Sequence, residues 1–311
     1  MTKRTRRLLG ATVVSLLLGL GLFLANSAAW PLPAPAPFAG PLPPASPPAE
    51  MAVFQLPTGS THRSAGFAYR GGSLADRREF AMTAVLVKHP RGDLLIDAGF
   101  GRDIDAHFAA MPLFFRAATR YTRGRSAAEQ LDAAGYDRTR LRGIVLTHAH
   151  WDHISGVSDF PGTPVWVPAE ERRFIAGGGS LTAVARSLGD VPYEEYGFDD
   201  GEYLGFPRSR DVHGDGSVVI VPAPGHTPGS VIVFLAPPGG RRFALVGDLV
   251  WQREGITERE ERPWLQRALA DVDPEGVREH LLRMAAIVAR FPEFVLVPAH
   301  DARGFAELPM L

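Results

Sequence analysis

The sequence predicts an α/β fold that carries a metal site at the carboxyl ends of its strands. Four short apolar runs, each of the length expected for a buried strand, are followed within a few residues by histidine or aspartate. In open α/β sheets, ligand-binding side chains commonly lie just beyond the carboxyl ends of strands. Residues 274–290 add an amphipathic helix pattern, which provides a covering layer for a sheet.

The densest group of potential metal ligands lies in residues 147–153, which read Thr-His-Ala-His-Trp-Asp-His. The imidazoles and the carboxylate of this motif suit zinc and related transition metals, and they belong to His148, His150, Asp152 and His153. Without an ion, these groups would compete for hydrogen-bond partners. They follow the apolar run 143–146, so we expect them in a loop after a buried strand. A histidine-rich surface loop is the alternative, and the spacing of the motif argues against it.

Three later apolar runs each lead to one further potential ligand. Run 217–221 leads to His226, run 243–246 to Asp248, and run 294–297 to His300. Each of these residues alone is weak evidence, because histidine and aspartate are common in loops and turns. Because all three follow strand-like runs as the 147–153 motif does, we expect them to converge on one site with it.

These motifs resemble those of the metallo-β-lactamase-fold hydrolase superfamily. The resemblance covers roughly residues 51–311 and rests on five segments, namely 92–99 with Asp97-Ala98-Gly99, 147–153, 225–229 with Gly-His-Thr-Pro-Gly, Gly247-Asp248, and His300. It implies a four-layer αββα sandwich with a dinuclear metal site at the edge between the two sheets.

The resemblance also implies a ligand set for two metal ions. The first ion is assigned to His148, His150 and His226, the second to Asp152, His153 and His300, and Asp248 bridges the two. Two Zn²⁺ ions per chain are the expected cofactor, and other divalent metals are the alternative.

Two acidic residues receive further roles from the resemblance. A hydroxide between the ions acts as the nucleophile, and Asp152 orients it and passes its proton to the leaving atom. Asp97 either accepts an N–H from a ligand imidazole or is a turn residue before Gly99.

The bridging Asp248 favours three branches of the superfamily over the true metallo-β-lactamases. These branches are glyoxalase II, the ribonuclease Z-like phosphodiesterases, and the N-acyl homoserine lactonase-like hydrolases. Near the start of the domain, the segment Lys88-His89-Pro90-Arg91-Gly92 resembles the turn between the first strands of the lactonase-like branch. Those lactonases usually carry a tyrosine three residues after the bridging aspartate, where it contacts the substrate carbonyl. This chain has Trp251 there, which we expect to form an apolar wall with one N–H donor.

Residues 108–121 are a second candidate for substrate contact. This segment is rich in apolar and aromatic residues, and related hydrolases carry a loop over the active site between the same two motifs. We expect Phe114 and Phe115 to line an acyl pocket. The alternative is a helix that packs against the sheet.

Together these features predict a zinc-dependent hydrolase that opens an ester or lactone in a small-molecule substrate. The alternatives are a β-lactam, thioester or phosphodiester hydrolase of the same fold, or an iron-dependent persulfide-type oxidoreductase. The full set of seven ligands favours hydrolysis.

Composition narrows the possible partners. The chain has a formal net charge of −1 and no basic patch in its sequence, so nucleic acid is not an expected partner. The chain has no cysteine, which excludes disulfides and thiolate ligands. The oligomeric state is left open.

The first 29 residues indicate export. Four basic residues within the first seven precede an apolar stretch over residues 8–25, and Ser27-Ala28-Ala29 supplies the small residues that a signal peptidase reads. We expect an exported protein, periplasmic or secreted, and an uncleaved inner-membrane anchor at residues 8–25 is the alternative. Membrane contact is expected only through this segment.

Three remaining segments complete the domain organisation. The proline-rich residues 30–50 are expected to form an extended, semi-rigid linker, and residues 51–311 form the hydrolase domain. The charged run Glu258–Arg262 is expected to be a solvated face. The helix over 274–290 is expected to bury one side, comprising Val277, Leu281, Met284, Ala285 and Val288.

Overall fold

Two β-sheets face each other in the computed structural model, which describes residues 15, 19, 21, 22 and 24–311. The seven-stranded sheet has the order β4-β1-β2-β3-β5-β6-β7, and the five-stranded sheet has the order β12-β11-β10-β9-β8. The strands of the first sheet are β1 (Ala52–Ser64), β2 (Arg77–Lys88), β3 (Asp93–Ile96), β4 (Tyr121–Arg123), β5 (Leu141–Val145), β6 (Val165–Pro168) and β7 (Tyr193–Tyr196). Those of the second are β8 (Arg210–Asp211), β9 (Val218–Pro222), β10 (Val231–Leu235), β11 (Arg242–Gly247) and β12 (Phe294–Pro298).

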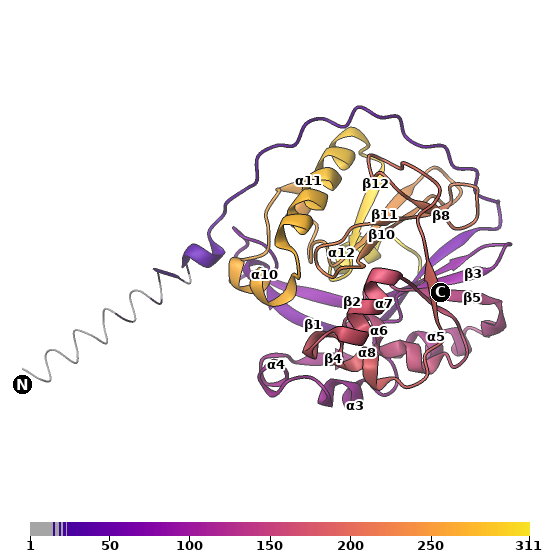
Figure 1. Cartoon of the computed structure of the whole chain (residues 1–311), viewed down its shortest axis with the longest axis horizontal. Coiled ribbons are helices and arrows are strands. Elements are labelled where there is room, and N and C mark those ends of the chain that lie inside the picture. The colour runs from indigo at the N-terminus through magenta and orange to yellow at the C-terminus, as the bar shows by residue number, and fades with distance from the viewer. Residues whose placement is uncertain (1–14, 16–18, 20, 23) are drawn as a thin grey trace, which may run out of the picture.

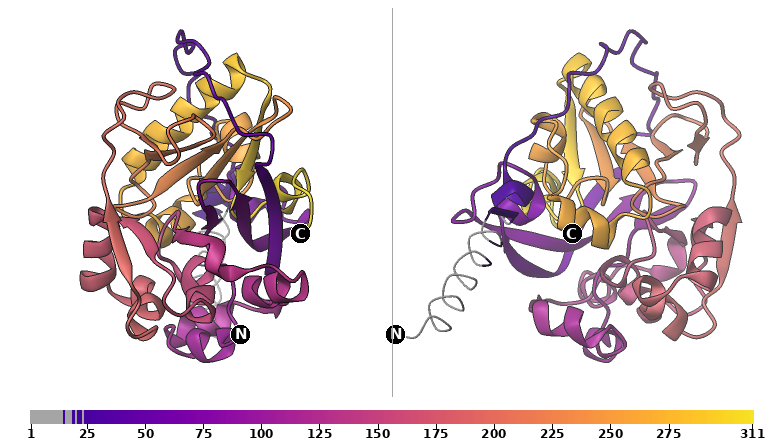
Figure 2. Two further views of the ribbon diagram at one scale, coloured as in Figure 1. Left: turned by 90° about the vertical axis from the view of Figure 1, so that its right-hand side faces the viewer. Right: turned by 60° about the vertical axis from the view of Figure 1, so that its left-hand side comes forward.

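Helices cover the outer face of each sheet, so the chain forms the expected four-layer αββα sandwich (Figures 1 and 2). The seven-stranded sheet is covered by α3 (Ile104–Ala109), α5 (Ala127–Ala133), α6 (Trp151–Ile154), α7 (Ala169–Gly177) and α8 (Ala183–Ser187). The five-stranded sheet is covered by α9 (Glu254–Thr257) and α11 (Pro274–Arg290). Other described α-helices are α2 (Ala65–Ala68), α4 (Leu113–Ala118), α10 (Trp264–Ala270) and α12 (Ala302–Phe305).

The inner faces of the two sheets form one apolar core. Val85, Ile96 and Val145 of the first sheet pack with residues of the second that include Ile220 and Leu245. All five side chains are less than 5 % exposed. Burial of this kind stabilises the fold by about 25 cal/mol for each Å² of apolar surface removed from water. The rigid core therefore fixes where each strand ends.

The longest helix has the bounds that its sequence pattern predicts. Helix α11 spans Pro274–Arg290, and four of the five expected core residues are buried, whereas Val288 is half-buried. Asp273 caps its first turn by accepting a hydrogen bond from the backbone N–H of Glu275 at 3.1 Å. Pro274 follows at the first helical position, where its missing N–H costs nothing.

The proline-rich segment 30–50 is extended, without helix or strand, and it packs along the domain. Leu32 is buried with the residues of α9 and α11, and the ring of Phe38 contacts that of Phe291 edge-on at 5.9 Å. The backbone N–H of Ser46 donates to the carbonyl of Asp215 at 2.7 Å. The composition predicts the extended conformation, and the structure adds a packing role along the outer face of the five-stranded sheet (Figure 1).

The expectation of a solvated face at Glu258–Arg262 is wrong for its last three residues. Glu260, Glu261 and Arg262 are at most 6 % exposed. Glu260 accepts from the backbone N–H of Trp30 at 3.0 Å, Glu261 accepts from Arg278 at 3.1 Å, and Arg262 donates to Asp271 at 2.8 Å. Buried ion pairs of this kind depend on partners distant in sequence, so a charge run alone does not distinguish them from a surface.

The predicted export segment lies mostly outside the described residues, because residues 1–14, 16–18, 20 and 23 are not described. Among the residues that the structure does describe, no helix combines the length and the apolar character needed to cross a bilayer.

Candidate metal centre

The seven predicted ligands come together at one edge of the sandwich. The loops that carry them follow β5, β9, β11 and β12, and all seven side chains are less than 10 % exposed. Strands β3 and β5 run parallel in one sheet, and β11 and β12 run parallel in the other. Parallel strands deliver their carboxyl ends to the same edge, which is how segments spread over 150 residues converge.

Three imidazoles form the first group of potential ligands. Nδ1 of His150 lies 2.9 Å from Nε2 of His226, and one nitrogen of His148 lies within 4.8 Å of one in each of them. Burial lowers the pKa of His148 and of His150 well below the usual value. A lowered pKa favours the neutral imidazole, which is the form that binds a metal.

The second group shares Asp248 with the first. Nε2 of His300 lies 3.5 Å from Oδ2 of Asp152, and His153 completes a cluster within 4.8 Å. Oδ1 of Asp248 lies 3.2 Å from Nε2 of His300, while its Oδ2 lies 3.4 Å from Nε2 of His226. Asp248 thus presents one oxygen to each group, so its carboxylate can be shared between them.

The unpaired atoms at this site fit metal ions. Nε2 of His148, Nε2 of His153 and Oδ1 of Asp248 are buried and have no hydrogen-bond partner among the described residues. Buried polar atoms nearly always have a hydrogen-bond partner or another ligand. Three buried atoms without such a partner, close to one another, therefore indicate a bound ligand. Imidazole nitrogen and carboxylate oxygen are donors that bind Zn²⁺ at about 2.0–2.2 Å. The residues therefore fit the two ions that the sequence predicts.

Carboxylates and a carbonyl behind the ligands fix their ring orientations. Nδ1 of His153 lies 2.8 Å from Oδ2 of Asp97, which is the first of the two roles considered for Asp97. Nδ1 of His226 lies 2.9 Å from Oδ1 of Asp271, and Nδ1 of His300 donates to the carbonyl of Ala81 at 3.0 Å. Such partners set the tautomer and direct the other nitrogen toward the metal. The sequence pattern did not indicate Asp271.

Glu171 joins two of the ligand loops and was not predicted. This carboxylate, on α7, is fully buried. It accepts hydrogen bonds from the backbone of Ala149 at 2.7 Å, from the backbone of Gly229 at 3.0 Å, and from the hydroxyl of Thr227 at 2.7 Å. Ala149 separates two ligands of the first group, and Thr227 follows the third. Glu171 therefore fixes the two loops that carry these three imidazoles relative to each other.

Trp251 has a different hydrogen-bond partner from the substrate contact expected for it. Its indole N–H donates to Oδ2 of Asp248 at 2.9 Å. Its ring stacks on Phe67 at 5.2 Å, and the guanidinium of Arg262 lies 4.6 Å from its centre. Arg262 in turn pairs with Asp271 and donates to the carbonyl of Asp248. Trp251 and Arg262 thus brace the bridging aspartate.

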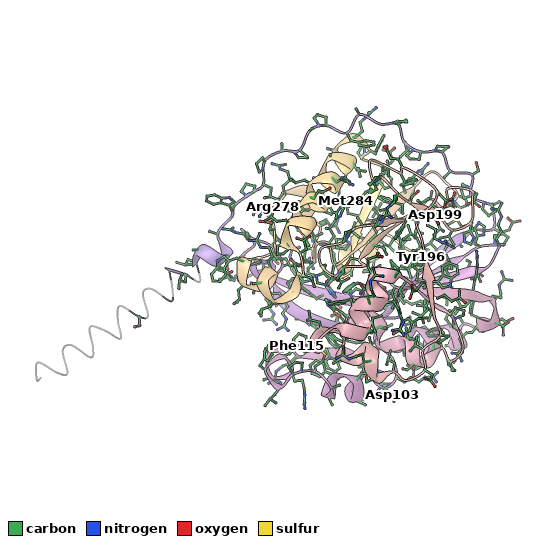
Figure 3. The ribbon with its side chains drawn as sticks, viewed as in Figure 1. Asp103, Phe115, Tyr196, Asp199, Arg278 and Met284 are labelled. Atoms are coloured by element: carbon green, nitrogen blue, oxygen red, sulfur yellow. The ribbon has the colours of Figure 1, made fainter. Side chains whose placement is uncertain are left out.

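The two phenylalanines expected at an acyl pocket lie in the outer helical layer. Phe115, labelled in Figure 3, packs edge-on against Trp151 at 5.9 Å and against Phe108, whereas Phe114 is 68 % exposed. This corresponds to the alternative of a helix packed on the sheet. An aromatic ring nearer the ligands is Phe174, whose centroid lies 6.4 Å from that of His150. It lines a surface pocket of about 420 Å³ together with Arg173, Pro228 and neighbouring residues.

Comparison with known proteins identifies the family. Residues 77–300 match the metallo-beta-lactamase superfamily. The chain belongs to this superfamily. It is 32 % identical to a probable metallo-hydrolase of Mycobacterium tuberculosis over 230 residues, which are 70 % of this chain and 73 % of the relative. It is 25 % identical to the N-acyl homoserine lactonase AttM of Rhizobium radiobacter over 191 residues, which are 58 % of this chain and 69 % of AttM.

Solved structures support the same fold. An N-acyl homoserine lactone hydrolase with its product N-hexanoyl-L-homoserine at the catalytic metal centre superimposes with a TM-score of 0.65. The match covers 83 % of this chain and 96 % of that one, at 17 % sequence identity. These structures confirm the αββα sandwich. Together with the family match and the related metallo-hydrolase, the chain is a metal-dependent hydrolase of this fold.

We predict that Glu171→Gln weakens metal binding. The amide can accept hydrogen bonds only through its oxygen, and its NH₂ group would face a backbone N–H, so one ligand loop loses its support. Zinc affinity should fall by about 10–100-fold, as is usual for groups behind a metal ligand. Titration of the metal-free protein against a chromophoric chelator measures it. Glu170→Gln, next in sequence but on the surface in a pair with Arg173, is the control and should bind zinc normally.

We also predict that Trp251→Phe lowers zinc affinity by about 10-fold while preserving the fold. Phenylalanine keeps the stacking on Phe67 but loses the N–H that holds Asp248. The same chelator titration reports the change, and Trp166→Phe is the matched control, since the Trp166 N–H is buried without a partner among the described residues. Equal affinities in the two variants would contradict the bracing role.

Proposed function

We propose that the chain is a zinc-dependent hydrolase that opens an ester or lactone ring in a small molecule, with two Zn²⁺ ions per chain. The observation that carries this is the shared Asp248, which presents one carboxylate oxygen to each of two ligand groups. Two bound divalent ions lower the pKa of water to near neutrality and polarise the carbonyl under attack. The similarity to a lactonase in sequence, and to a lactone hydrolase in fold, supports a lactone as the substrate.

Side chains near the ligands would handle the proton and contact the substrate in this reaction. Oδ2 of Asp152 lies 3.5 Å from Nε2 of His300 in the second group, where this carboxylate can orient the attacking water and carry a proton to the leaving oxygen. The indole N–H of Trp251 donates its hydrogen bond to Asp248, so it does not donate to the substrate carbonyl. Metal ions bound at this site would then supply the activation of the carbonyl. The pocket beside Phe174 and Pro228 provides an apolar surface for the rest of the substrate.

Metal content and substrate preference test this proposal together. Purified protein should contain about two equivalents of zinc per chain by elemental analysis, as expected for a two-metal site. It should hydrolyse lactones or aryl esters faster than thioesters, phosphodiesters or β-lactams. One equivalent of iron with no hydrolysis would instead support the oxidoreductase alternative. Rapid turnover of phosphodiesters or β-lactams without lactone cleavage would refute the proposed substrate class.

Asp152→Ala should lower kcat by at least about 10²-fold, the low end of general acid–base contributions. Its loss removes both a ligand of the second metal and the proton carrier. Steady-state kinetics with the preferred substrate, at a zinc concentration that saturates both proteins, measures the effect. Asp132→Ala removes an exposed carboxylate that pairs only with surface arginines, and it should leave kcat unchanged. Normal turnover by the fully metallated Asp152→Ala protein would rule out this role.

A further inference from the structure

Apolar side chains are exposed together along helix α10. Trp264, Leu265 and Leu269 are 41 %, 48 % and 61 % exposed, and Val272, just beyond the helix, is 50 % exposed. None of the seven residues of α10 is buried. Soluble proteins usually scatter exposed apolar residues singly, and a contiguous group of this kind marks a contact surface. These side chains are therefore available to contact a partner.

The segment that follows the apolar N-terminal stretch is attached to the same surface. The side-chain oxygen of Asn26 accepts a hydrogen bond from the backbone N–H of Leu265 at 2.9 Å. The guanidinium of Arg70 donates to the carbonyl of Ala28 at 2.9 Å, and Gly71 N–H donates to that of Ser27 at 2.8 Å. Figures 1 and 2 show residues 24–27 beside α10, in agreement with these contacts.

More apolar surface is exposed on this attached segment. Leu24 is 55 % exposed and Trp30 is 69 % exposed, and the guanidinium of Arg70 lies 5.9 Å from the ring of Trp30. Exposed leucines, two tryptophans and an arginine form the combination found where proteins meet the headgroup region of a bilayer. Residues 8–25, which contain no charged residue, lead directly into this surface.

We propose that α10, Val272 and residues 24–30 form a membrane-docking surface, and that its occupant is a lipid bilayer. In this proposal the uncharged apolar residues 8–25, most of which are not described, are the tether that joins the domain to the bilayer. The leucines of α10 then lie at the boundary of the acyl chains, with the indoles of Trp30 and Trp264 at headgroup level. The chain itself argues for lipid, because an uncharged apolar stretch of this length ends where the exposed apolar surface begins.

The contacts of residues 25–28 also favour an uncleaved chain. Arg70 and Gly71 hold the backbone of Ala25, Ser27 and Ala28, and the last two belong to the Ser27-Ala28-Ala29 stretch that a signal peptidase would read. In this form the domain stays tethered at the point where its apolar surface can reach the lipid.

The docking surface lies beside the metal centre. Helix α10 is flanked by Arg262 and Asp271, which pair with each other at 2.8 Å. Asp271 holds His226, and the backbone N–H of Val272 donates to the carbonyl of His226 at 3.2 Å. A bilayer that contacts α10 therefore lies close to the first ligand group.

Spin labelling of the full-length chain tests the docking surface. The chain has no cysteine, so Leu269→Cys and Leu113→Cys each give a single labelled site. Leu113 on α4 is the matched control, because it is also exposed, at 77 %. In vesicles of phosphatidylethanolamine and phosphatidylglycerol, the ratio of accessibility to oxygen over aqueous nickel complex should be at least about threefold higher at 269, as for side chains below the headgroups.

Three outcomes would overturn the proposal. A water-like ratio at both sites excludes contact with lipid. Strong spin–spin broadening at 269, in detergent and in vesicles alike, would instead identify a second copy of the chain as the occupant. Protein recovered from its native membrane fraction should begin at Met1, and a start at Trp30 would remove the tether. None of these measurements uses hydrolysis, so they remain valid whatever the substrate.

A polar variant supplies the converse test. Trp264→Gln with Leu265→Gln should lower the oxygen-to-nickel ratio at a label on residue 269, whereas Leu113→Gln with Phe114→Gln should not. Both pairs replace exposed apolar residues on short helices with a residue of good helix propensity, so they are matched in the kind of change. An unchanged ratio in the first pair would show that α10 does not contribute to docking.

Discussion

The arrangement of this protein depends on one buried carboxylate. Asp248 lies between two groups of ligands, and five imidazoles and two carboxylates of the site are almost entirely removed from water. Burying so many polar groups is costly unless each finds a partner. The strands of both sheets end where their loops can supply these groups to Asp248. The αββα core is therefore the rigid frame that holds a site unfavourable by itself.

A second layer of interactions makes the ligand positions specific. Asp97 holds His153, Asp271 holds His226, and Glu171 joins the loops of His148–His150 and His226. Each of these acidic groups is buried or nearly so and comes from a different element. Arg262 links Asp271 to the backbone of Asp248, and α10 is the segment between Arg262 and Asp271. The exposed apolar helix and the metal centre are therefore joined through one short stretch of chain.

Much of this arrangement could be predicted from the sequence, for physical reasons. A ligand that follows an apolar strand run is positioned by that strand, so His226, Asp248 and His300 could be placed without knowing the tertiary fold. For helix α11, the Asp-Pro cap and the spacing of the apolar residues indicate in the sequence where the helix lies and which side is buried. Glu171, Asp271 and Arg262 were missed because their roles depend on partners distant in sequence. The N–H of Trp251 was assigned to substrate for the same reason, since its contact with Asp248 exists only in the folded loop.

The central claim is that one shared carboxylate joins two metal sites. Crystals of the zinc-loaded protein, with anomalous diffraction measured on both sides of the zinc absorption edge, test it most directly. We predict two zinc peaks about 3.5–4 Å apart, as in other two-metal sites, on either side of Asp248. One peak should lie among His148, His150 and His226, and the other among Asp152, His153 and His300. A single peak in fully loaded crystals, or a second peak away from Asp248, would contradict the account.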